Sequence, residues 1–175
     1  MTTTEFVVPT TTDWPDWSTH RRTVGRAVRS SLHCVIATTG PDGTPHVTPI
    51  GSVVLTEPGR GIYLEIFASR LGRNLDHDPR FCLLAVDSSK GFWLESLVRG
   101  RFTKPPGIRL TGTAGPRREA TEQEQARFRR QVAPLRMTRG HRILWTRGDR
   151  ARDLYFDAAI PLRLGAMTAG TIAAT

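Results

Sequence analysis

The sequence predicts a mainly β fold, a small barrel of about six to seven antiparallel strands with peripheral helices. Short apolar and β-branched runs recur along the chain, and glycine or proline bounds each of them. Tight turns join most of these runs, and such turns connect antiparallel neighbours. The 175 residues suffice for one buried core, so we expect a single domain over residues 13–163. The Thr-rich residues 1–12 are expected to be disordered, and residues 164–175 to form a weakly patterned tail.

The first part of the chain is expected to form a surface helix and three strands. A helix capped by Asp16 or Ser18 runs to about Ser30. The strands are expected at residues 33–39, 44–55 and 62–67. Two turns rich in Gly and Pro, at residues 40–43 and 57–61, join them into a meander. Pro45 and Pro49 cannot donate backbone hydrogen bonds, so the second strand must have an irregular or open edge.

The second part adds two helices and four strands. The strands are expected at residues 81–86, 108–114, 142–147 and 152–156. A short helix over residues 71–76 precedes them, and Thr121 with Glu124 forms the capping box of another helix, which Pro134 ends. Residues 88–107 have no regular pattern and are expected to form a long excursion without a core element.

The strands at residues 33–39 and 81–86 are apolar almost throughout, which is typical of strands buried on both faces. They carry the two cysteines, Cys34 and Cys82, which are expected to be buried, reduced thiols. These cysteines lack the companions of a metal site, so no metal is expected. Together with an N-terminus that has no signal-peptide pattern and the absence of an apolar run of about 18 residues, they favour a cytoplasmic protein that does not span a membrane.

The net charge of +9 comes entirely from the second half of the chain. Residues 1–90 hold nine basic and nine acidic residues, whereas residues 91–175 hold sixteen and seven. A basic half suits an anionic cofactor or substrate, or nucleic acid. Aromatic residues are sparse there and no nucleic-acid motif is present, so we expect a small-molecule ligand and no nucleic acid.

A candidate anion site lies where the third strand leads into the helix over residues 71–76. The run ends in Ala68-Ser69-Arg70, and Arg73 and Asn74 follow one turn later. The first N–H groups of a helix have no partner within it, and they attract phosphate together with the helix dipole and an arginine. The alternative is that Ser69 caps its own helix and Arg70 extends into solvent.

Three segments carry a resemblance to a known family: CVIATTGPDGTPHVTPI, IYLEIFASRLGRNLDHDPRFCLLAV and LTGTAGP. In this order they resemble the pyridoxamine 5'-phosphate oxidase-related, FMN-binding split β-barrel superfamily. Within it they are most similar to the flavin- and deazaflavin-dependent oxidoreductases. The resemblance covers about residues 14–160. It implies a homodimer with two flavin sites at the subunit interface.

The resemblance also implies which residues hold the flavin. The isoalloxazine ring would lie along His46, Val47, Thr48 and Pro49, where His46 either donates to the ring or simply packs. The phosphate would be held by Ser69, Arg70, Arg73 and Asn74, the same segment as the candidate anion site, and Phe67 and Ala68 at the end of the preceding strand are also expected to bind the cofactor. Trp145 and Arg152 resemble residues that the second subunit brings to the flavin. Their structural alternative is an indole packed in the barrel and an arginine paired with Asp153 or Asp149.

Two positions depart from the family pattern. Leu71 stands where the family often has a lysine that helps to neutralise the phosphate, and Gly51 stands where many relatives have an aromatic residue. One lost charge contact weakens a phosphate site by ~1–3 kcal/mol. Arg70 and Arg73 are expected to compensate.

The sequence thus predicts an FMN-binding oxidoreductase that passes a hydride or electron pair between bound flavin and a small organic substrate. No catalytic side chain is expected, because the cofactor carries the redox chemistry. One alternative is a reductase that uses the deazaflavin coenzyme. Its polyglutamate tail would suit the basic residues Arg99, Arg101, Arg109, Arg117 and Arg118. Another alternative is a non-catalytic flavin- or haem-binding protein, with His46 or His141 as the iron ligand.

Overall fold

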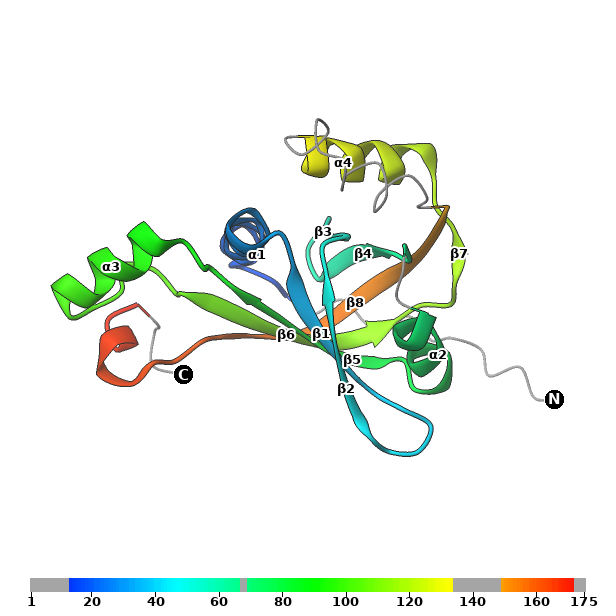
Figure 1. The fold of residues 1–175 in the computed structure, drawn as a ribbon, viewed down its shortest axis with the longest axis horizontal. Coiled ribbons are helices and arrows are strands. Elements are labelled where there is room, and N and C mark those ends of the chain that lie inside the picture. The colour runs from blue at the N-terminus through cyan, green and yellow to red at the C-terminus, as the bar shows by residue number, and fades with distance from the viewer. Residues whose placement is uncertain (1–12, 67–68, 134–148, 172–175) are drawn as a thin grey trace.

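A computed structural model describes residues 13–66, 69–133 and 149–171 (Figure 1). The helices in these ranges are α1 (Trp17–Ser31), α2 (Ser69–His77), α3 (Lys90–Arg99), α4 (Glu122–Val132) and the short 3-10 helix η2 (Gly165–Thr168). The strands are β1 (Cys34–Thr39), β2 (Pro45–Ile50), β3 (Val53–Leu55), β4 (Arg60–Leu64), β5 (Arg80–Val86), β6 (Gly107–Ala114), β7 (Arg118–Glu119) and β8 (Arg150–Pro161). Residues 1–12 and the strand predicted at 142–147 lie outside the described residues.

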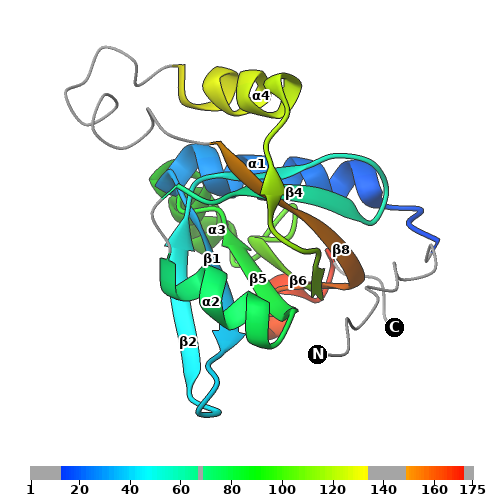
Figure 2. The same cartoon turned by 90° about the vertical axis from the view of Figure 1, so that its right-hand side faces the viewer.

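The eight strands form one antiparallel sheet. Its order is β2-β1-β5-β6-β8-β4-β3, and β7 pairs with β8. β2 and β3 lie at opposite ends of this order, yet only Gly51 and Ser52 separate them along the chain, so the two ends of the sheet lie close together. The sheet therefore curls into a half-barrel, with α2 beside β1 and β2 (Figure 2). The predicted split β-barrel with antiparallel strands and peripheral helices is confirmed.

The predicted meander is wrong at its second strand. Residues 44–55 divide into β2 and β3 at Gly51 and Ser52; β2 pairs with β1, whereas β3 pairs with β4. A Cβ at Gly51 would lie 2.7 Å from the carbonyl oxygen of Leu32, the residue that ends α1. Glycine allows this close approach, and the chain turns there from one strand into the other. β2 ends the sheet, as its two prolines predict.

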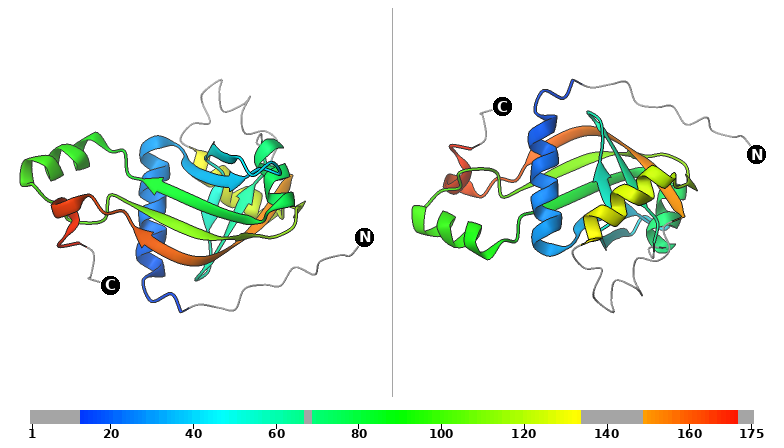
Figure 3. Two further views of the ribbon diagram at one scale, coloured as in Figure 1. Left: turned by 90° about the horizontal axis from the view of Figure 1, so that it is seen from below. Right: turned by 90° about the horizontal axis from the view of Figure 1, so that it is seen from above.

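Burial along β1 and β5 alternates, which corrects the prediction that both faces are covered. Ile36 and Leu83 are fully buried, and α1 crosses the strands over this face (Figure 3). Their neighbours Val35, Cys82 and Leu84 point to the opposite face and are only partly buried. The described part of the chain therefore covers this apolar face of the sheet only in part, and Cys82, unlike Cys34, is not fully buried.

The region predicted as an irregular excursion contains α3. Asp87 receives hydrogen bonds from the backbone N–H and hydroxyl of Ser89, and the Trp93 indole N–H donates to the Asp87 carbonyl. Phe102 lies between the rings of Phe92 and Trp93. The helix projects from the body of the molecule next to η2 (Figure 3). Its exposed residues include Leu94, Leu97 and Val98. Because apolar side chains point outward as well as inward, the sequence shows no amphipathic period here.

The remaining helices and β8 agree more closely with the sequence. The capping box of Thr121 and Glu124 begins α4, as predicted. β8 covers residues 150–161 instead of 152–156, and it pairs with β4, β6 and β7. No helix within the described ranges is long and apolar enough to cross a membrane.

Candidate functional site

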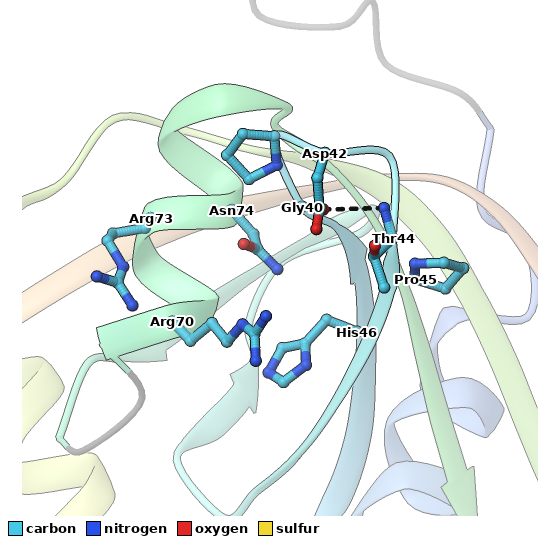
Figure 4. A pocket seen from close by; sticks show the side chains of 9 residues that line it. Gly40, Asp42, Thr44, Pro45, His46, Arg70, Arg73 and Asn74 are labelled. Carbon is cyan, nitrogen blue, oxygen red and sulfur yellow. Dashed lines mark hydrogen bonds between the residues drawn. The ribbon is translucent and has the colours of Figure 1, made fainter.

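A pocket of about 550 Å³ opens between α2 and the turn that joins β1 to β2 (Figure 4). The turn and the start of β2 form one wall, and α2 forms the other. The lining residues are Gly40, Pro41, Asp42, Thr44, Pro45, His46, Arg70, Arg73 and Asn74. Four residues of the sequence-predicted site, His46, Arg70, Arg73 and Asn74, are thus brought together from segments about 25 residues apart.

The turn wall is fixed by local hydrogen bonds. The Gly43 N–H donates to the Gly40 carbonyl at 2.9 Å, and the Gly40 N–H donates to the Thr44 carbonyl at 2.9 Å. The Thr44 N–H donates to Oδ1 of Asp42 at 3.0 Å. Gly43 adopts a φ of 77°, which favours glycine. These residues were recognised as a turn from the sequence, but nothing in their spacing indicated that the turn would face α2.

The helix wall is held to the sheet by Asn74. Its side-chain N–H₂ donates to the hydroxyl of Thr38 on β1 at 3.0 Å, and both residues are buried. Leu71 and Leu75 pack into the core on the neighbouring side of α2. Arg70 and Arg73 are exposed and project from the helix at the pocket, and the Arg70 side chain extends toward His46 (Figure 4). Asn74 therefore anchors the wall, while the two arginines are available to a ligand.

The four predicted ring-binding residues of β2 divide between the two faces of the strand. His46 and Thr48 lie on the face of Thr38 and Ile36, their partners on β1, and this face bears the pocket. The Thr48 hydroxyl oxygen is buried and has no hydrogen-bond partner among the described residues. Val47, which is 60% exposed, and Pro49 point to the opposite face. Side-chain contacts from one chain to a ligand in the pocket can thus come from His46 but not from Val47 or Pro49.

The electrostatics of the pocket favour an anion. Arg70 and Arg73 on α2 both line it, with the Arg70 guanidinium toward His46 and that of Arg73 on the opposite side of the helix (Figure 4), and no salt bridge engages either within the described part of the chain. One carboxylate, Asp42, also lines it. Hydrogen bonds from Thr44, and to a lesser extent the charge of Arg70, hold the pKa of Asp42 below its usual value. The helix N-terminus adds positive potential at the same place.

Arg152 lies away from the surface, in a cluster of charged side chains. It is 1% exposed; its Nε contacts Glu65 at 2.6 Å and its Nη2 contacts Asp76 at 2.6 Å. The sequence-based pairing with Asp153 or Asp149 is therefore wrong, and Asp153 pairs with Arg118 instead. Burial acts to lower the pKa of Arg152, but the hydrogen bonds to the two carboxylates outweigh it and the pKa is raised.

Several predicted residues cannot be placed at the pocket. Phe67, Ala68, Trp145 and His141 lie outside the described residues, and Ser69 is the first residue of α2. The two departures from the family pattern have physical reasons in this fold. Leu71 is fully buried in the core, and at Gly51 the carbonyl of Leu32 leaves no room for a side chain. Neither position faces the pocket, so neither removes a contact from it.

The five arginines considered for a coenzyme tail do not gather into one groove within a chain. Arg99 and Arg101 lie at the end of α3, on one side of the molecule, whereas Arg117 and Arg118 lie beside β7 on the other (Figure 1). Arg109 is on β6 between them. Three of the five are paired with carboxylates: Arg99 with Glu95, Arg117 with Glu65 and Asp76, and Arg118 with Glu124 and Asp153.

A family model described as pyridoxamine 5'-phosphate oxidase matches residues 23–153, which include β1 to β7, α2 and the pocket. This chain belongs to the pyridoxamine 5'-phosphate oxidase family. A search of curated proteins found no match.

Solved structures related to this pyridoxamine 5'-phosphate oxidase family member share its fold at low sequence identity. An FMN-binding protein from Syntrophomonas wolfei subsp. wolfei is 10% identical, with a TM-score of 0.60 over 85% of this chain and 89% of that chain. HupZ from Group A Streptococcus is 16% identical, with a TM-score of 0.53 over 83% and 95%. An F420 reductase is 13% identical, with a TM-score of 0.52 over 81% and 95%. At these identities the likeness extends to the fold alone.

Proposed function

We propose that this chain is an FMN-binding oxidoreductase that passes a hydride or an electron pair between the flavin and a small organic substrate. The observation that carries the proposal is the pocket between α2 and the β1–β2 turn. Arg70 and Arg73 line it at the start of a helix, at the position where the family resemblance implies a phosphate. Two guanidinium groups and a helix N-terminus suit the dianionic end of FMN.

The residues present fit this cofactor at both of its ends. The two arginines would bind the phosphate, and the buried Thr48 hydroxyl, which lacks a partner among the described residues, supplies a polar group on the strand where the ring is implied to lie. His46 stands between these positions and can hydrogen-bond either. When bound, the flavin supplies the redox chemistry. The chain binds it, orients its ring along β2 and excludes water from one side.

The functional unit that we propose is a homodimer with the cofactor at the subunit interface. The pocket described here is open on one side, and the apolar face formed by Val35, Val47, Cys82 and Leu84 is only partly covered by the described residues of one chain. Burying this face against a second copy would remove apolar surface from water and enclose the site. We expect light scattering to give twice the 19.5 kDa chain mass at micromolar concentration. A monomer at that concentration would contradict this part of the proposal.

FMN is favoured over the deazaflavin coenzyme by the distribution of the arginines. A polyglutamate tail needs unpaired basic residues along a continuous path, whereas Arg99, Arg117 and Arg118 are already paired with carboxylates. FMN ends at its phosphate and needs only the arginines at the start of α2. The absorption spectrum of the purified protein separates the two cofactors, and it also separates both from haem in a non-catalytic storage protein.

The test of the proposed function is a fluorescence titration of FMN. Arg70→Ala and Arg73→Ala should each weaken binding by ~1.5–3 kcal/mol, the range for a hydrogen bond to a charged group. Arg21→Ala and Arg29→Ala are the matched controls, because they remove exposed arginines of α1 that do not line the pocket. The controls should change affinity by less than ~0.5 kcal/mol. If both pairs of variants behave alike, the phosphate does not bind at α2.

A further inference from the structure

We propose that Arg152 is a positioning residue of the anion site: it fixes the orientation of α2 and thereby the directions in which Arg70 and Arg73 point. The proposal deepens the proposed function, and it rests on that function only in naming the FMN phosphate as the ligand. Arg152 itself does not line the pocket. Its role follows from where its hydrogen bonds go.

Four segments meet at the Arg152 side chain. Glu65 follows β4, Asp76 lies on α2, Arg117 precedes β7, and Arg152 is on β8. Arg152 contacts both carboxylates at 2.6 Å, and Arg117 contacts Glu65 at 2.6 Å and Asp76 at 3.5 Å. Two positive and two negative groups thus compensate one another. We call these four residues the Arg152 cluster.

Arg152 hydrogen-bonds to the backbone of α2 as well as to the Asp76 side chain. Arg152 Nη2 donates to the Gly72 carbonyl at 3.2 Å, and Nη1 donates to the Gly115 carbonyl at 3.3 Å. A Cβ at Gly72 would lie 2.7 Å from Arg117 Nη2 and 3.0 Å from Glu65 Oε1. These two side-chain tips would have to move if residue 72 carried a side chain, so α2 lies directly against the charged groups.

The three roles of α2 occupy three faces of the helix. Gly72 and Asp76 are four residues apart and share the face toward the cluster, while Leu71 and Leu75 share the face toward the core. The remaining face carries the pocket residues Arg70, Arg73 and Asn74. A helix held on two adjacent faces cannot roll about its axis. Loss of the cluster leaves α2 held only by Leu71, Leu75 and the Asn74–Thr38 hydrogen bond, so the helix can tilt or turn and move the tips of the two arginines. A displacement of about 1 Å at a binding group is enough to lower its contribution substantially.

Arg118 provides a matched control. It also bridges two carboxylates, Glu124 and Asp153, each at 2.6 Å, but these belong to α4 and β8 and neither contacts α2. Replacement of either arginine by methionine removes one charge and keeps most of the side-chain length. Only Arg152→Met releases α2.

The experiment measures FMN and inorganic phosphate affinity by calorimetry, together with hydrogen exchange of the α2 amides, in wild type, Arg152→Met, Arg118→Met and Asp76→Asn. We expect Arg152→Met to weaken both ligands about tenfold and Asp76→Asn about threefold, with faster exchange confined to α2. Arg118→Met should stay within about twofold of wild type. Asp76, whose side chain is half exposed, serves as the test position if Arg152→Met does not fold.

The outcomes separate this inference from the proposed function. Unchanged affinity and unchanged α2 exchange in Arg152→Met, or in Asp76→Asn if the former does not fold, would overturn the positioning role. Equal losses in Arg152→Met and Arg118→Met would also overturn it, because a general structural effect would then suffice. If wild type binds phosphate but not FMN, the proposed function fails while the phosphate and exchange measurements still decide the role of Arg152.

Discussion

The two sides of α2 use the same type of residue for opposite purposes. On one side, Arg152 and Arg117 approach Glu65 and Asp76, and their charges are neutralised within the chain. On the other side, Arg70 and Arg73 line a pocket with no carboxylate bridged to either of them among the described residues. An arginine is therefore available to bind a ligand where the fold leaves its charge uncompensated. Charge content alone does not reveal this, since both pairs contribute equally to the net charge.

The largest expected effect is the loss of stability when Arg152 is removed from the cluster. Arg152→Met leaves Glu65 and Asp76 with only Arg117 to neutralise them, and removal of one partner from a buried ion pair costs ~3–5 kcal/mol of unfolding free energy. Arg118→Met should cost about 1 kcal/mol, because the Arg118 side chain is 32% exposed and its carboxylates can be solvated. Urea denaturation of the two variants measures the difference. Similar losses would mean that burial does not distinguish the two arginines.

The next effect tests how closely α2 rests on the cluster. Gly72→Ala places a Cβ 2.7 Å from Arg117 Nη2 and 3.0 Å from Glu65 Oε1, so these two side-chain tips must shift, and we expect a cost of about 1 kcal/mol, the low end for overpacking. Gly91→Ala, also on a helix, is the control, because its Cβ meets no atom within 4 Å. The control should stabilise the protein by ~0.4–1 kcal/mol, since alanine loses less conformational entropy on folding. A gain equal to that of Gly91→Ala would show that the side chains of the Arg152 cluster move aside without cost.

The sequence predicts local features of this molecule well and long-range ones poorly. The turn at Gly40–Gly43 and the capping box at Thr121 are decided by neighbouring residues, and both form as predicted. The family resemblance predicts that α2 holds a phosphate because its motif is continuous in sequence, and α2 forms one wall of the pocket. The partners of Arg152 lie 87 and 76 residues away, so no local pattern indicates that pairing.

Two errors in the prediction of the fold from the sequence have the same origin. The strand over residues 44–55 divides because Gly51 meets the carbonyl that ends α1, and this contact is not visible in the strand itself. The helix α3 was missed because Leu94 and Val98 are exposed, which removes the period on which helix prediction depends. In both cases tertiary contacts, or their absence, outweigh the local pattern.

The smallest expected effect is the change in FMN affinity when the charge of Asp42 is removed from the pocket. Asp42 is the one carboxylate lining the pocket beside Arg70 and Arg73, and its lowered pKa keeps it charged at neutral pH. Asp42→Asn removes that charge while the amide oxygen can still accept the Thr44 N–H. Because Asp42 is exposed, its repulsion of a bound phosphate is weak and is screened by salt.

We therefore expect Asp42→Asn to bind FMN up to about fivefold more tightly than wild type at low ionic strength, and nearly equally at high ionic strength. Glu57→Gln is the control, since it neutralises an exposed acid in the other turn and does not line the pocket. Its affinity for FMN should remain that of wild type at both ionic strengths. If Asp42→Asn binds FMN more weakly than wild type, the main role of the Asp42 carboxylate is to hold the turn that forms the pocket wall. Its repulsion of the phosphate would then be negligible. An equal gain in FMN affinity in both variants would mean that affinity depends on the net charge of the whole chain. It would contradict the assignment of the pocket as the phosphate site.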